Sequence, residues 1–160
     1  MKRILLIFAT VLCAASLARA EHFRIELTVK GTSDEATAHS DTDPPPQGTQ
    51  PRPVCHVKRG EPFTIQFFFS SNFPHDVQKN VTVRFFVAPE RAAGKKSPPD
   101  RDKPPVTESN FLMDFKPDTG RVGLRQRLRI DRPGAYLVKV GSEHSDSDHE
   151  HFAAVDLVVD

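Results

Sequence analysis

The sequence has 160 residues, of which 22 are basic and 21 acidic, with a formal net charge of +1 at neutral pH. This length is typical of one globular domain. Because basic and acidic residues are nearly equal in number, binding of nucleic acids through net charge alone is excluded. Fourteen prolines, most of them between apolar runs, disfavour long helices.

The first 20 residues, MKRILLIFATVLCAASLARA, have the pattern of a secretory signal. Two basic residues precede a short apolar run, and a small-x-small triplet ends the segment. The apolar run is too short for a membrane span. We therefore predict cleavage after Ala20, one domain over 21–160, a secreted or periplasmic location and no membrane-spanning segment.

Cleavage at this point changes both the charge and the thiol content. Removal of residues 1–20 takes away three basic residues and no acidic one, which leaves 19 against 21, formally −2. Cys55 is then the only thiol, so an internal disulfide is excluded. A small buried hydrophobe is the favoured interpretation of Cys55, with a reactive thiol as the alternative.

Apolar and polar residues alternate along most of the processed chain, with the period of two that is typical of β-strands. In HFRIELTV, for example, four apolar residues share one face and Arg24, Glu26 and Thr28 the other. No stretch has helical spacing. In chain order, the predicted strands are 22–29, 54–58, 62–69, 81–87, 110–115, 122–130, 135–140 and 152–159.

The segments between these strands are rich in turn-forming residues. Lys58–Glu61, Asp118–Gly120 and Asp131–Gly134 carry the signals of tight hairpin turns. Residues 31–53 and 90–106 are expected to be long, Pro-rich, mobile loops. The predicted fold is therefore all-β: a single immunoglobulin-like antiparallel β-sandwich of seven or eight strands with two long loops.

Two motifs carry a resemblance to known modules. GEPFTIQFFF (60–69) and RPGAYLVKV (132–140) resemble the immunoglobulin-like and fibronectin-like sandwich modules of bacterial secreted proteins. The resemblance implies that Tyr136 is a corner tyrosine whose hydroxyl bonds to backbone near the preceding turn. The cysteine pair and the tryptophan of antibody domains are missing, so architecture is implied and function is not.

Strand order in such a sandwich brings the loops 71–79, 116–120 and 142–150 to the rim at which the first strand begins. Imidazole and carboxylate groups together suit Zn²⁺ or Cu²⁺. Two interpretations stay open: a copper or zinc site, or a solvated loop that is rich in histidine and aspartate. The candidate ligands at this rim are His22, His75, His144, Asp148, His149 and His151.

Copper is favoured among the metals by two features. His22 would be the second residue after cleavage, where its imidazole, the α-amino group and the intervening amide form a tetragonal nitrogen set. The DSDH at 146–149, before the last strand, is similar to the Asp-x-His of periplasmic copper-resistance sandwich proteins. The sequence lacks the Met-rich segment of that family, since only Met113 remains after cleavage.

Two outward-facing patterns suggest a contact surface. Arg125, Arg127 and Arg129 alternate, so they project from one face of one strand and can bind an anionic polymer or partner surface. The alternative is a solubilising face that protects an edge strand. Phe68 and Phe86 point away from the core residues of their strands and can form an outward aromatic pair, which is either a contact surface for another protein or covered by the 31–53 loop.

No enzyme signature accompanies these patterns. The sequence has no serine elbow, no glycine-rich phosphate loop and no HExxH. We therefore interpret the chain as a non-catalytic secreted or periplasmic binding module whose partner is a protein or a cell-surface component, not a nucleic acid. The alternative is a periplasmic copper or zinc carrier.

Overall fold

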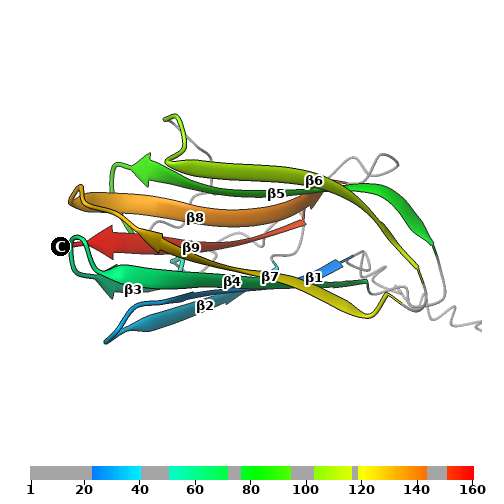
Figure 1. The fold of residues 1–160 in the computed structure, drawn as a ribbon, viewed down its shortest axis with the longest axis horizontal. Helices are drawn as coiled ribbons and strands as arrows, with labels where there is room; N and C mark the ends of the chain where they lie inside the picture. Colours follow the sequence, from blue (N-terminus) through cyan, green and yellow to red (C-terminus); the bar gives the residue numbers. More distant parts are fainter. Residues whose placement is uncertain (1–22, 41–50, 72–76, 95–102, 117–118, 144–150) are drawn as a thin grey trace, which may run out of the picture.

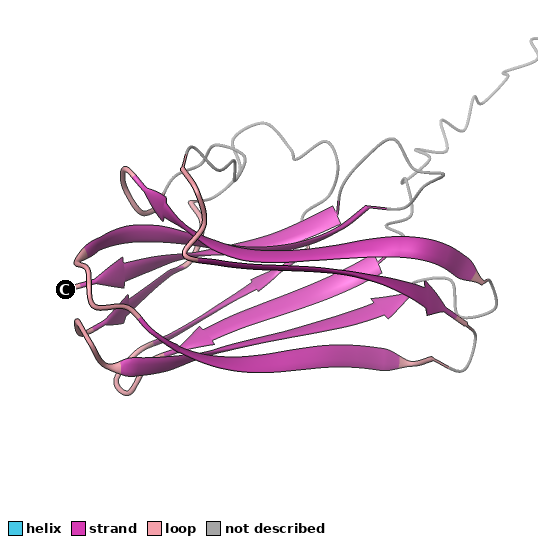
Figure 2. Cartoon of the chain, turned by 45° about the horizontal axis from the view of Figure 1, so that its top comes forward, coloured by secondary structure: helices cyan, strands magenta, loops and turns pink. Residues whose placement is uncertain are grey.

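The structure is a computed structural model that describes residues 23–40, 51–71, 77–94, 103–116, 119–143 and 151–160. These residues form strands and connecting segments without a helix, as Figure 2 shows, and therefore include no helix able to cross a membrane. The strands are β1 (Phe23–Lys30), β2 (Glu35–His39), β3 (Val54–Val57), β4 (Pro62–Ser71), β5 (Gln78–Glu90), β6 (Thr107–Phe115), β7 (Arg121–Arg129), β8 (Gly134–Glu143) and β9 (His151–Val159).

The strands form two sheets that face each other (Figure 1). One sheet has the order β2-β1-β4-β7, and the other has the order β3-β9-β8-β5-β6. All neighbouring pairs are antiparallel except β3 and β9, which are parallel. The arrangement confirms the predicted β-sandwich. Within the two sheets, β1-β4-β7 and β5-β8-β9 follow the order of immunoglobulin-like sandwiches.

The core lies between the sheets and is built from the predicted alternation. Every second residue of β1 and β4 is buried, and the fully buried side chains include six phenylalanines. The ring of Phe67 in β4 stacks on that of Phe85 in β5, with centroids 5.6 Å apart. Each buried phenylalanine contributes about 1.5–3 kcal/mol of hydrophobic free energy, so the core stabilises the fold without a disulfide.

The prediction of a loop over 31–53 is wrong in part, because Glu35–His39 forms β2. This strand makes a hairpin with β1, in which Thr28 lies opposite Thr37. The only side chains that β2 buries are those of Ala36 and Ala38. Two alanines give too weak an alternation for the strand to stand out in the sequence.

The predicted tight turns at Lys58–Glu61 and Asp131–Gly134 do not form hairpins, and Asp118 of the third predicted turn lies outside the described residues. At Lys58–Glu61 the Glu61 N–H donates to the Lys58 carbonyl at 3.0 Å, and Gly60 has a φ of 75°, which a non-glycine residue adopts at a cost. This turn joins β3 to β4, and Asp131–Gly134 joins β7 to β8. In both cases the two strands belong to different sheets.

Two single residues lie where the sequence places them. The hydroxyl of Tyr136 donates to the carbonyl of Arg132 at 2.7 Å, which is the contact expected of a corner tyrosine. Cys55 is fully buried in the core cluster, which confirms its interpretation as a buried hydrophobe. Burial also raises the pKa of its thiol, so the thiolate is disfavoured.

A buried ion cluster on the outer face of the five-stranded sheet attaches two connecting segments to β9. The Arg52 guanidinium donates to both carboxylate oxygens of Glu90 at 2.8 Å and, through Nε, to Oδ1 of Asp156 at 2.7 Å. The Gly94 N–H donates to Oδ2 of Asp156 at 2.6 Å. The segments before β3 and after β5 are thereby fixed against one carboxylate with no exposed surface.

Candidate binding face

The outer face of the four-stranded sheet, called the basic face below, concentrates positive charge. It consists of the residues of β1, β2, β4 and β7 that alternate with those facing the core. Six of these side chains are cationic and two are carboxylates, although the chain as a whole has a formal net charge of only +1. The cations are Arg24, Lys30, Arg121, Arg125, Arg127 and Arg129, and the acids are Glu26 and Glu35.

The arginine row of β7 forms the border of this face. Among the described residues β7 is the last strand of its sheet, and Arg125, Arg127 and Arg129 are exposed. Arg129 lies 3.4 Å from Asp131, whereas Arg125 and Arg127 form no ion pair within the described part of the chain. Their neighbours in β4 are Gln66 and Thr64, which are neutral. Two cations are thus available to a partner.

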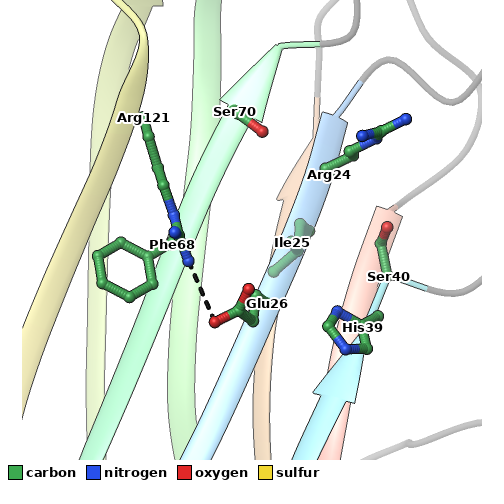
Figure 3. Close-up of a pocket in the computed structure, with 8 residues that line it drawn as sticks. All are labelled: Arg24, Ile25, Glu26, His39, Ser40, Phe68, Ser70 and Arg121. Atoms are coloured by element: carbon green, nitrogen blue, oxygen red, sulfur yellow. Dashed lines mark ion pairs between the residues drawn. The ribbon is translucent and has the colours of Figure 1, made fainter.

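An aromatic ring, a guanidinium and a carboxylate form a compact group at one end of the basic face (Figure 3). The Arg121 guanidinium carbon lies 3.7 Å from the centroid of the Phe68 ring, a cation–π contact. One of its nitrogens also lies 3.1 Å from a Glu26 oxygen. The two contacts place the Arg121 guanidinium above the sheet, beside the Phe68 ring.

This group forms one wall of an open hollow of about 480 Å³. The hollow extends across β7, β4, β1 and the end of β2, as the labelled side chains in Figure 3 show. Its lining combines hydrogen-bond donors and acceptors with one apolar ring and includes a single carboxylate, that of Glu26. The lining residues are Arg24, Ile25, Glu26, His39, Ser40, Phe68, Ser70 and Arg121.

The predicted pair of Phe68 and Phe86 does not form. Phe68 lies on β4 and Phe86 on β5, and these strands belong to different sheets. Because both side chains point outward, they lie on opposite faces of the sandwich. The prediction took strands consecutive in sequence as neighbours, whereas the actual neighbours of β4 are β1 and β7. The partner of Phe68 is Arg121.

Most candidate metal ligands lie outside the described residues. The strand ends around them do meet at one rim: Phe23 pairs with Ser71, and its ring contacts that of Phe115 from the other sheet at 4.9 Å. His151, the described candidate, is only 4% exposed and faces Ser142. Within the described part of the chain no three potential ligands are grouped. The copper or zinc site stays a prediction, and His22, His75, His144, Asp148 and His149 are the residues not described.

Sequence reasoning singled out the β7 arginines but missed the residues that join them across the sheet. The alternation of the first strand predicts only that Arg24 and Glu26 lie on its polar face, and His39 belongs to a segment predicted to be a loop. The signal that could have pointed to the group is Gly123, a glycine within a predicted strand, which often marks a close approach of another group.

Comparison with known proteins gives no family. No family model and no curated protein matches the sequence. Among solved structures, the chain is similar to a chitin binding domain from Burkholderia pseudomallei, with a TM-score of 0.39 and 15% sequence identity. The match covers 68% of this chain and 57% of that one, so this chain spans little more than half of that structure's length. The function therefore has to be inferred from this chain's own residues.

Proposed function

We propose that the protein is a non-catalytic binding module that uses the basic face to bind an anionic partner, a protein or a cell-surface component. The observation that supports the proposal is the separation of charge: six cations and two carboxylates share one sheet face of a chain that has 22 basic and 21 acidic residues in all. Such a face attracts anionic partners over distances of about a Debye length, roughly 10 Å at 0.1 M salt.

The spacing of the arginines suits a partner with repeated charges. Alternate residues of a strand are about 6.7 Å apart, so Arg125 and Arg127 project two cationic side chains from evenly spaced backbone positions. Guanidinium groups bind carboxylate, sulfate or phosphate through two parallel hydrogen bonds. The row therefore fits a partner that carries anions along an extended chain or a flat surface.

Arg121 adds a donor beside an aromatic ring. Because its guanidinium already contacts Phe68 and Glu26, less side-chain entropy is lost when a ligand binds in the hollow than for an arginine without such contacts. We therefore assign Arg121 to orientation of the partner and the β7 row to attraction.

We also propose that the protein is exported. This part of the proposal depends on residues 1–20, which lie outside the described residues.

Binding of the processed chain to immobilised polyglutamate tests the proposal. We expect an affinity that decreases as salt is raised, and a several-fold loss in the double variant Arg125→Gln/Arg127→Gln. The matched control is Arg91→Gln/Lys103→Gln, which neutralises two exposed cations that lie outside the basic face. An equal loss in both variants, or a preference for a neutral polysaccharide that does not depend on salt, would overturn the proposal.

A further inference from the structure

The flank of the sandwich between β6 and β7 contains an apolar groove. Each of these strands is the last of its sheet among the described residues, and the two lie on the same side of the sandwich. Phe111 and Met113 of β6 and Val122 and Leu124 of β7 line the groove, which has a volume of about 200 Å³. Leu124 is 40% exposed, so apolar surface faces solvent here.

The edge of β7 is able to pair with a further strand. β4 occupies one edge of β7 over nine residue pairs, from Ser70–Arg121 to Pro62–Arg129. In an antiparallel pair, every second residue turns its N–H and C=O away from its partner, so alternate residues of β7 direct these groups outward. No described strand pairs with this second edge.

The geometry of β7 determines the side chains that an added strand must carry. Side chains of a strand alternate between the two faces of its sheet. One half of them would lie over Leu124 and Phe111 in the groove, and the other half beside the arginine row. Apolar residues suit the first position, and acidic residues suit the second, because Arg125 and Arg127 form no ion pair with described residues.

From this geometry we propose that the free edge of β7 receives an extended segment of a protein partner in which apolar and acidic residues alternate. The segment becomes the fifth strand of the four-stranded sheet. This inference rests on the proposed function, since it uses the same arginines, and it narrows the partner from any polyanion to a peptide strand.

A second copy of this chain is a poorer occupant of the edge. If two β7 strands paired in an antiparallel arrangement, their arginine rows would lie opposite each other on the same outer face. Like charges directly opposite each other across a strand pair are destabilising. Charge complementarity therefore favours a partner strand with acids over self-association.

The test compares three synthetic peptides with the processed chain at one fixed salt concentration. The first alternates valine and glutamate, the second has the same composition in two blocks, and the third alternates valine and lysine. We expect the first peptide to bind roughly ten-fold more tightly than the second, and the third not to bind. Leu124→Ser should weaken the first peptide alone, whereas Arg125→Gln/Arg127→Gln should weaken both glutamate peptides.

Hydrogen exchange of the β7 amides supplies a readout that depends on strand pairing. Alternate β7 amides should become protected when the first peptide is added, and they should remain unprotected with polyglutamate. Equal binding of both glutamate peptides, without this protection, overturns strand addition and leaves the proposed function standing. Absence of binding to any anionic probe overturns both. Dimerisation of the free chain, or β7 amides fully protected before any peptide is added, shows a different occupant and overturns the inference.

Discussion

The ring of Phe68 lies on the backbone of Gly123, in the space that a Cβ at position 123 would occupy. A Cβ built there would come within 2.7 Å of Cε1 of Phe68 and 2.8 Å of the Phe67 carbonyl oxygen. The two residues pair directly across β4 and β7. The missing side chain thus lets an aromatic ring lie close to the sheet surface, where Arg121 covers it.

Substitution of Gly123 by alanine should therefore disturb the basic face. We expect Gly123→Ala to lower the free energy of unfolding by about 1–3 kcal/mol, the usual cost of overpacking. In a Phe68→Ala background Gly123→Ala should lower the free energy of unfolding by less, because the new Cβ would then be close only to the Phe67 carbonyl oxygen. Urea denaturation of the four proteins in this double-mutant cycle measures the coupling. Additive costs would contradict the steric account.

Removal of Arg52 should be far more damaging than removal of an exposed arginine. Its side chain is 8% exposed and neutralises Asp156 and Glu90, which are 0% and 6% exposed. Arg52→Met leaves two buried carboxylates without their cation, and such changes cost about 3–5 kcal/mol. Arg132→Met, at an exposed position, is the control and should cost little. Comparable melting temperatures for both variants would contradict the role of the cluster.

The cost of Arg52→Met should depend on pH. Burial raises the pKa of Asp156 above its ordinary value of 3.8, against the opposing effect of Arg52. A raised carboxyl pKa means that the folded state holds its proton more tightly, so this contribution to stability is present below pH 3.8 and is lost as pH rises through the folded-state pKa. Without Arg52 that pKa rises further. The deficit of the variant should therefore be largest at neutral pH and shrink toward pH 3, as measured by urea midpoints across this range.

Asp34 should show the opposite dependence on pH. Hydrogen bonds from the backbone N–H groups of His56 and Glu35, at 2.8 and 2.9 Å, lower its pKa below 3.8. The contribution of Asp34 is therefore present above pH 3.8 and lost as pH falls through the lowered value. We expect Asp34→Asn to be less stable than the parent at neutral pH, with the gap closing in acid. A constant gap from pH 2 to pH 7 would show that Asp34 acts without its charge.

The corner tyrosine gives a prediction that concerns one hydrogen bond. Tyr136 is 3% exposed, and its hydroxyl donates to the Arg132 carbonyl. Tyr136→Phe keeps the ring and removes the donor, so the free energy of unfolding should decrease by about 1 kcal/mol. Thermal unfolding of the variant beside the parent protein checks this. An unchanged melting temperature would mean that water replaces the bond at no cost.

The sequence predicted strands best where large apolar residues alternate. HFRIELTV and PFTIQFFF correspond to β1 and β4, and the face assigned to the core in each is the buried one. The prediction failed for EATAH, because alanine side chains carry little hydrophobic signal, and β2 is held instead by its hydrogen bonds to β1. The alternation of residues in a segment indicates how much apolar surface that segment can bury. The hydrogen bonds of its backbone to a neighbouring strand produce no pattern in the sequence.

The sequence by itself determined the class of fold, the inner and outer faces of its long strands and the tight turn at Lys58–Glu61, since these follow from side-chain alternation and backbone preferences. The tertiary structure decided which strands are neighbours. It placed the 58–61 and 131–134 segments between sheets, separated Phe68 from Phe86, and brought Arg121 onto Phe68 and Glu26. The physical reason is that the packing of one sheet on the other selects the partner of each strand, and with it the side chains that share the basic face.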